Sequence, residues 1–348
     1  RLRRHIFGSL ATAALGDAMG AATEQHTTEE VVAMFGGLLR DLHAPSTDTF
    51  SAGNQPGQIT DDTSQMLALA QALIEAGGTL DSHTWLQALL YWSTTSPMAR
   101  MMGPTTRPLL EALAAGQDTA HIGRSPHSTR KFASFGATNG AAMRVAPAGL
   151  LYPGDIESAV HLSWLTCLPT HDTQIAAAGA GAIAAGVAEA LVPGADVFSV
   201  ARACMQGARL GEALGAREGR RVPGPSVVRR IEIAVDEALC ATSLHEAIGR
   251  IEASVGNSVM TVESVPAAVG IFVAAAGDPL EVAAGGASIG NDTDTIAAMA
   301  GALAGALRGV DSVPTQLLET VLAANSEDIE GIAEGLTALA WRRLASTG

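Results

Sequence analysis

Residues 175–191, IAAAGAGAIAAGVAEAL, and the similar stretch 296–307, IAAMAGALAGAL, decide the class of fold. Alanine and glycine recur three to four residues apart in both stretches, which is the spacing of one helix face. Side chains this small let two helix backbones approach closely. We therefore expect a central pair of buried helices, without inferring a repeat architecture from the likeness.

The apolar residues outside these stretches also follow a helical period, and glycine and proline separate the segments. Aromatic residues make up only 4% of the chain, which favours closely packed helices over a β-sandwich. We expect an all-α bundle without strands. The expected helices are 6–22, 61–76, 83–92, 107–115, 156–168, 173–191, 197–214, 226–239, 244–254, 265–276, 280–289, 294–307, 314–325 and 329–343. Residues 42–58 and 116–140 are expected to be loops, and loops of this length usually serve a site.

Composition excludes several classes of protein. Hydrophobic residues are 47% and charged residues 16% of the 348, so the chain is not disordered. The 21 basic and 35 acidic residues give a net charge of −14, and Lys131 is the single lysine, which argues against nucleic-acid binding. The longest uncharged apolar run, 175–188, is too short to cross a membrane. Cys167, Cys204 and Cys240 have no metal-ligand spacing, so we expect reduced, buried thiols in a cytoplasmic protein.

Two acidic motifs precede very apolar helices: ITDDT at 59–63 and GNDTDT at 290–295. Each alone fits an ordinary helix start, with a capping side chain and acids that offset the helix dipole. Two such starts would however bury several carboxylates, and no lysine or arginine is nearby in the sequence. A divalent cation would remove the repulsion, and oxygen ligands suit magnesium, manganese or calcium better than zinc. The residues alone leave both interpretations open.

Three further motifs carry weaker signals. GDAMG at 16–20 places Asp17 inside an apolar helix, with Glu24 just beyond its end, and local capping is the ordinary explanation. The small-residue loop 134–140 could offer backbone N–H groups to a phosphate or a sugar hydroxyl. The sequence THD at 170–172 holds a histidine that is either structural or a ligand contact.

Taken in order, these motifs resemble the ADP-ribosylglycohydrolase family. The resemblance rests on GDAMG with Glu24, TDDT at 60–63, NGAAMR at 139–144, TH at 170–171 and GNDTDT at 290–295. It covers residues 8 to about 307. It implies a compact orthogonal multi-helix bundle, with residues 1–348 as one domain. It also implies a centre of two magnesium ions, or of manganese, in a cleft.

The resemblance also implies a role for each matching residue. The implied metal ligands are Thr60, Asp61, Asp62, Asp292, Asp294 and Thr295. The implied catalytic carboxylates, acting as general base or steadying an oxocarbenium-like centre, are Glu24, Asp61 and Asp62. The implied substrate contacts are Asn139, Gly140 and His171. The small-residue loop adds Gly136 and Thr138 as expected contacts. Because aromatic residues are scarce, Phe135, or alternatively Phe132, is the expected stacking residue. Asn291 stands where glycine is common in the family.

The reaction that the resemblance implies is hydrolysis at the anomeric carbon of ribose. The expected substrate is an ADP-ribosylated protein or another ADP-ribose conjugate. Two alternatives stay open: a hydrolase of a smaller N- or O-ribosyl compound, and a non-catalytic ADP-ribose-binding protein. The acidic pI of about 5.0 argues against partners such as nucleic acid or anionic membrane.

Overall fold

The computed structural model describes residues 1–347, which form sixteen α-helices and three 3-10 turns and, apart from three isolated bridges, no strand. The all-α prediction is therefore confirmed. In chain order the helices are α1 (Leu2–Gly20), α2 (Thr28–Phe35), α3 (Asp61–Glu75), α4 (Ser82–Thr95), α5 (Thr106–Ala114), α6 (Ala146–Leu150), α7 (Ile156–Cys167), α8 (Gln174–Ala190), α9 (Val197–Glu218), α10 (Val227–Cys240), α11 (Leu244–Val255), α12 (Thr261–Ala274), α13 (Pro279–Ser288), α14 (Thr293–Arg308), α15 (Thr315–Ala324) and α16 (Ile329–Thr347).

All fourteen helices expected from the sequence are present, with ends within four residues of the prediction. The periodic pattern missed α2 and α6. Helix α2 has eight residues and is fixed by a capping box between Thr27 and Glu30 rather than by a long apolar face. Helix α6 has five residues, with Pro147 in its first turn, so it is too short to show a period.

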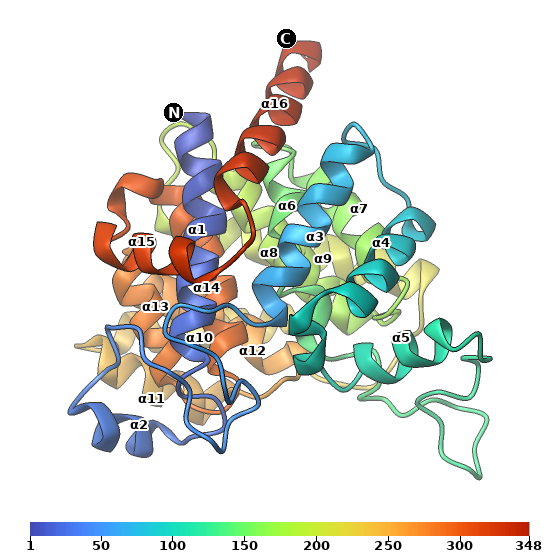
Figure 1. Ribbon diagram of the computed structural model, residues 1–348, viewed down its shortest axis with the longest axis horizontal. Helices are drawn as coiled ribbons and strands as arrows, with labels where there is room; N and C mark the ends of the chain where they lie inside the picture. Colours follow the sequence, from blue (N-terminus) through green and yellow to red (C-terminus); the bar gives the residue numbers. More distant parts are fainter. Residues whose placement is uncertain (348) are drawn as a thin grey trace.

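Helices α1 and α14 run side by side through the middle of the molecule (Figure 1). Their contact depends on glycine. A Cβ atom added to Gly16 would lie 2.3 Å from the Ala297 carbonyl oxygen, and one added to Gly305 would lie 2.0 Å from the Gly8 oxygen. A Cβ on Gly20 would meet Asp294 Cα at 2.5 Å. The two backbones thus touch along the length of α1, and the contact brings the acidic start of α14 beside Asp17.

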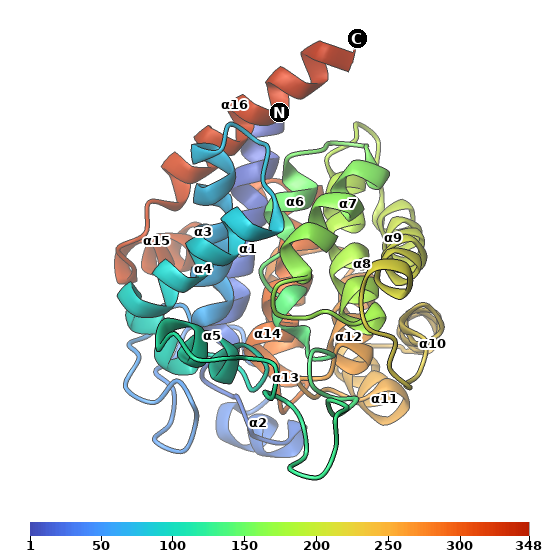
Figure 2. The same ribbon diagram turned by 90° about the vertical axis from the view of Figure 1, so that its right-hand side faces the viewer.

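The helices of the two alanine- and glycine-rich stretches, α8 and α14, are both buried, as expected. They touch where Gly186 faces Leu303. Each nevertheless packs most closely against a different partner, since α14 lies along α1 and α8 lies along α9. A Cβ on Gly207 of α9 would stand 2.2 Å from the Gly181 oxygen of α8. The expected central pair is therefore two close pairs, seen from the side in Figure 2.

A continuous hydrophobic core includes buried residues from Leu2 to Ala340. Residues 42–58 carry no helix, and the segment from 116 has none before the 3-10 turn Asn139–Ala141, so both predicted loops are confirmed. No helix among the described residues could span a membrane. Of the cysteines, Cys167 and Cys204 are buried, but the expectation is wrong for Cys240, which is exposed at the end of the amphipathic helix α10.

Candidate metal centre and ligand cavity

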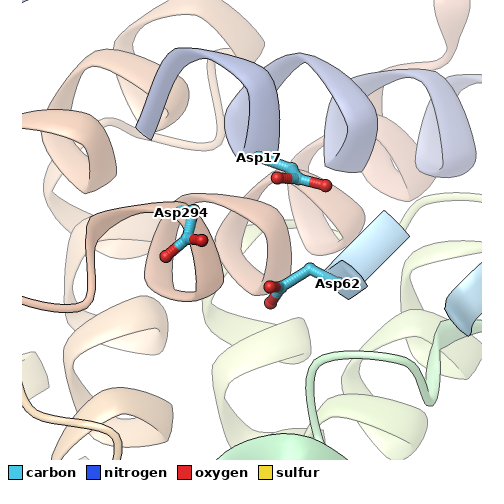
Figure 3. A group of neighbouring side chains, drawn as sticks. All are labelled: Asp17, Asp62 and Asp294. Atoms are coloured by element: carbon cyan, nitrogen blue, oxygen red, sulfur yellow. The ribbon is translucent and has the colours of Figure 1, made fainter. Parts of the chain in front are cut away.

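Acidic side chains from three helices meet at one point. Asp17 lies on α1, Asp62 in the first turn of α3, and Asp294 in the first turn of α14, and they face one another (Figure 3). One carboxylate oxygen from each lies within 4.8 Å of the other two. Glu24 and Asp292 form a second group of this kind with Asp294. The two acidic motifs, 231 residues apart at Asp61 and Asp292, thus come together, as the family resemblance implied.

Asp17 ties the start of α3 to α1. Its carboxylate accepts the backbone N–H of Thr60 at 3.1 and 3.0 Å and that of Thr63 at 3.1 Å. These N–H groups have no partner within their own helix. Burial raises the pKa of Asp17 to about 6, although the hydrogen bonds with Thr60 and Thr63 act in the opposite direction. Local capping was the ordinary explanation for Asp17, but the helix that it caps begins 44 residues later, at Asp61.

The first turn of α3 holds its two acids differently. Thr60 caps the helix, and its hydroxyl donates to Asp62 Oδ2 at 3.1 Å. The other oxygen, Asp62 Oδ1, is buried with no hydrogen-bond partner among the described residues. Asp61 Oδ2 accepts from Gln65 Nε2 at 2.9 Å. Burial, followed by the negative charges of neighbouring carboxylates, raises the pKa of both Asp61 and Asp62 well above the usual value.

Asn139, in the loop that begins at residue 134, forms a hydrogen bond to the start of α14. Asn139 donates to Asp292 Oδ2 at 2.6 Å, and Thr295 donates to Asp292 Oδ1 at 3.3 Å. Burial raises the pKa of Asp292 to about 6 and that of Asp294 well above the usual value. The preceding residue, Asn291, has φ +60°, a left-handed conformation that glycine adopts freely and asparagine tolerates.

Glu24 follows the end of α1 and lines the same space. Burial raises its pKa to about 8, and the charges of Asp292 and Asp17 add to this, while a hydrogen bond with Ser51 lowers it. The turn that carries Glu24 is fixed to the rest of the fold, because the Thr23 hydroxyl contacts the carbonyl oxygens of residues 20 and 287.

Six carboxylates, each at most 7% exposed, therefore share one region: Asp17, Glu24, Asp61, Asp62, Asp292 and Asp294. None of them accepts a hydrogen bond from a lysine or arginine within residues 1–347. The expectation that no basic residue is nearby needs one correction. Arg144 is fully buried and reaches Asp61 through Gln65, because the AAMR motif turns inward.

A cavity of about 330 Å³ opens onto this cluster. Most of the predicted site residues line it, namely Glu24, Asp61, Asp62, Thr138, Asn139, Gly140, His171, Asp292, Asp294 and Thr295. His171 and Gly140 are in close contact, since a Cβ on Gly140 would lie 2.9 Å from His171 Cε1. Burial, with the positive charge of Arg144, lowers the pKa of His171 well below the usual value, so the ring is neutral.

Three predicted residues are absent from the cavity lining. Thr60 acts as a helix cap. Phe135 packs its ring on Gly123, with the Lys131 ammonium 5.3 Å from its centroid. Gly136 has φ +79° and donates its N–H to Thr105 Oγ1. The alternative stacking residue, Phe132, is exposed and is likewise absent from the lining.

The aromatic residue at the cavity is Phe50, which the sequence analysis did not select. It comes from loop 42–58, is 66% exposed, and stands near Arg100, whose guanidinium donates to the Phe50 carbonyl at 3.3 Å. Arg107, Met101 and Met102 complete this rim. No local motif marks these residues, although the length of the loop predicted that it serves a site.

Comparison with known proteins identifies the family. The family model described as ADP-ribosylglycohydrolase matches residues 1–345. The protein YegU of Escherichia coli strain K12, itself uncharacterized, is 33% identical over 95% of this chain and 96% of its own length. ADP-ribosylhydrolase ARH3 of Homo sapiens is 27% identical over 92% and 90% of the two chains. The solved structure of an ADP-ribosylglycohydrolase-related protein complex has the same fold, with a TM-score of 0.68 at 23% identity and coverage of 97% and 99%. The chain therefore belongs to the ADP-ribosylglycohydrolase family and is a glycosidic bond hydrolase, as its ordered motifs predicted.

Proposed function

We propose that this enzyme is a metal-dependent hydrolase that cleaves the bond at the anomeric carbon of ribose in an ADP-ribosylated protein or another ADP-ribose conjugate. One observation carries the proposal: five of the six buried carboxylates line one cavity, and Asn139, Gly140 and His171 line it too. The family match and the similarity to ARH3, named an ADP-ribosylhydrolase, support this class of substrate.

The residues present fit divalent cations. A cluster of six acids would repel itself at neutral pH, and burial makes each charge costly. Asp62 Oδ1 is buried without a hydrogen-bond partner, as expected for an oxygen that ligates an ion. We propose two Mg²⁺ ions, with Mn²⁺ as the alternative, held by Thr60, Asp61, Asp62, Asp292, Asp294 and Thr295. When bound, such ions polarise ribose hydroxyls and lower the pKa of water. Asp17 and Glu24 belong to the same acidic groups, which adds them to the candidate ligands.

Glu24 is the candidate general base. It lines the cavity, and a base must lie within hydrogen-bond reach of the water that it deprotonates. Its pKa is about 8, raised by burial and by the charges of Asp292 and Asp17, so it is mostly protonated at pH 7 in the metal-free protein. Bound cations would offset the charges of Asp292 and Asp17 and so lower this pKa, which would favour the deprotonated, basic form of Glu24. Asp61 and Asp62 remain the alternative catalytic carboxylates.

The part of the cavity lining formed by residues 138–140 and His171 would hold the ligand. Thr138 and Asn139 offer hydroxyl and amide groups there, with Gly140 and the His171 ring beside them. Phe135 and Gly136 would support this part of the lining rather than touch the ligand. Because the core extends from Leu2 to Ala340, we propose that residues 1–348 act as one domain. We also propose a cytoplasmic enzyme that uses neither nucleic acid nor membrane as a partner.

A smaller N- or O-ribosyl substrate is the second candidate. The cavity volume of about 330 Å³ is near the lower end of the range for ligand pockets, and this favours a compact ligand. Comparing kcat/KM for an ADP-ribosylated peptide with that for a simple ribosyl compound decides between the two candidates.

The test of the proposed function is release of ADP-ribose from ADP-ribosylated protein, with Mg²⁺ or with excess EDTA. We expect activity only with Mg²⁺, and a loss of at least about 100-fold in Asp62→Asn and Asp292→Asn. Glu319→Gln, an exposed acid on α15, is the matched control and should keep full activity. Activity that survives both EDTA and the two site variants would refute the proposal.

A further inference from the structure

Arg144 is a charged residue without an obvious reason to be buried. It follows the 3-10 turn Asn139–Ala141, and its side chain is fully inaccessible. The guanidinium lies 5.3 Å from the Trp85 ring centroid and forms no ion pair with a carboxylate. Burying a charge without a counter-charge costs several kcal/mol. The fold bears this cost at a position between the acidic cluster and His171.

Two chains of hydrogen bonds start at Arg144. On one side, Arg144 Nη1 donates to Gln65 Oε1 at 2.9 Å, and Gln65 Nε2 donates to Asp61 Oδ2 at 2.9 Å. On the other side, Nη2 donates to Thr170 Oγ1 at 2.8 Å, and that hydroxyl lies 2.8 Å from His171 Nδ1. We call these chains the Asp61 arm and the His171 arm. Their ends, Asp61 and His171, both line the cavity.

The guanidinium sets the direction of both arms because it donates hydrogen bonds and never accepts them. Gln65 must turn its carbonyl oxygen to Arg144, so its amide NH₂ faces Asp61. Thr170 accepts from Arg144, so its own hydrogen is available to His171 Nδ1. At the far side of the ring, His171 Nε2 lies 3.0 Å from Thr138 Oγ1.

Thr138 gives independent evidence for the same arrangement. Its hydroxyl donates to Thr105 Oγ1 at 2.8 Å, so it must accept from His171 Nε2. Both ends of the arm therefore assign the neutral tautomer of His171 with its proton on Nε2. In this arrangement the Thr138 oxygen keeps a lone pair, which can accept from a hydroxyl group such as those of ribose.

We propose that Arg144 is a positioning residue for two parts of the cavity lining: through Gln65 it orients Asp61 in the acidic cluster, and through Thr170 it secures the hydrogen bond at His171 Nδ1 that, together with Thr138 at Nε2, fixes the tautomer of His171. The proposal rests on the proposed function for the identity of the ligands, Mg²⁺ and ADP-ribose. The directions of the two arms rest only on the hydrogen bonds described above. Arg144 itself lies outside the cavity lining and touches neither ligand.

Variants that cut one arm at a time test the proposal. Gln65→Leu removes the Asp61 arm, and Thr170→Val removes the His171 arm. We expect Gln65→Leu to weaken Mg²⁺ binding about 10-fold in calorimetric titration, as is typical when a partner of a metal ligand is lost. Thr170→Val should leave Mg²⁺ affinity within about twofold, but should weaken ADP-ribose binding several-fold in the Mg²⁺-loaded protein. Arg144→Met should show both losses, and Arg144→Lys, which keeps a donor, should recover part of them.

Nitrogen NMR of the imidazole gives a readout that does not depend on activity. In the metal-free wild type, His171 should show the pattern of a ring protonated at Nε2, and this pattern should be altered in Thr170→Val and Arg144→Met but not in Gln65→Leu. Thr337→Val, which removes a buried threonine hydroxyl in α16, is the matched control. If Arg144→Met does not fold, the two single-arm variants still decide the question.

Three results would overturn the proposal: a wild-type His171 protonated at Nδ1, an unchanged spectrum in Thr170→Val, or equal losses of both affinities in both single-arm variants. The last result would indicate a general loss of structure. A different result would refute the proposed function. A wild type that binds neither Mg²⁺ nor ADP-ribose would refute the proposed function, while the NMR comparison would still decide whether Arg144 fixes His171.

Discussion

Replacing Asp292 with asparagine should stabilise the metal-free protein and abolish its stabilisation by Mg²⁺. Burial raises the pKa of Asp292 from 3.8 to about 6. At pH 7.5 the charged form therefore costs about 3 kcal/mol of folding stability, at about 1.4 kcal/mol per pH unit. Asparagine removes this cost and keeps an acceptor for Asn139. With about 2.1 cal/mol/K of unfolding entropy per residue, the 348 residues give about 0.7 kcal/mol/K, so Tm should rise by up to about 4 °C.

Mg²⁺ should stabilise the wild type more than the Asp292→Asn variant. At 100 times its Kd, a ligand that binds only the folded state adds about 2.7 kcal/mol, or again about 4 °C, to the wild type. Asp292→Asn lacks one proposed ligand and should gain little. Thermal unfolding of both proteins in EDTA and in Mg²⁺ measures all four values. A variant less stable than the wild type in EDTA, with an undiminished response to Mg²⁺, would refute the reasoning that these acids are held together for a cation.

The pH dependence gives a second check on the same prediction. Asp17 and Asp292, with pKa values of about 6, and Glu24, with about 8, all titrate above their unfolded values. Such groups contribute stability that is complete below about pH 4 and is lost as the pH rises through 6 and then 8. The Tm of the metal-free wild type should therefore fall between about pH 5 and pH 8.5. The fall should be smaller in Asp292→Asn, and Mg²⁺ should flatten it.

Three further predictions concern the helix contact and the rim. Gly16→Ala should lower the free energy of unfolding by about 1–3 kcal/mol and weaken Mg²⁺ binding, because the added Cβ would collide with the α14 backbone. The control is Gly249→Ala on α11, where no atom lies near the added Cβ; it should be neutral or stabilising in the same unfolding experiments. Arg100→Glu should raise the ratio of kcat/KM for arginine-linked ADP-ribose to kcat/KM for serine-linked ADP-ribose about 10-fold, because the positive charge of Arg100 at the rim repels the guanidinium of an arginine-linked substrate. An unchanged ratio would show that the leaving group does not lie near Arg100. Phe50→Ala should raise KM about 10-fold through lost stacking, whereas Phe135→Ala should lower Tm with little change in KM.

The sequence predicts the parts of the site that are encoded locally. The acids at the starts of α3 and α14 were identifiable because each motif combines capping hydroxyls with paired carboxylates directly before an apolar helix. The structure brings both motifs to one cavity. Phe135 was predicted to stack on the ligand because aromatic residues are scarce. Its ring instead packs against the backbone of Gly123, a contact that no local sequence pattern reveals.

The parts that the sequence concealed are long-range partners. Asp17 resembles a local cap, yet it accepts the N–H groups of residues 60 and 63. Arg144 resembles an ordinary helix-flanking arginine, yet it lies wholly inside the molecule. In both cases the side chain satisfies a group on another helix, so its role depends on which helices are neighbours. Periodicity predicts which face of a helix is buried, but it does not identify what that face meets.

The glycines of the GDAMG motif explain why fold and site cannot be separated in this chain. Gly16 and Gly20 allow α1 to touch α14, and the contact at Gly20 is with Asp294 Cα itself. Asp17, between them, faces Asp294 and at the same time holds the first turn of α3, which carries Asp62. A larger residue at either glycine would therefore move the carboxylates apart before it exposed any apolar surface. The acidic cluster follows directly from a glycine-dependent helix contact in the core, and this is why the small-residue pattern that decides the fold class also determines the site.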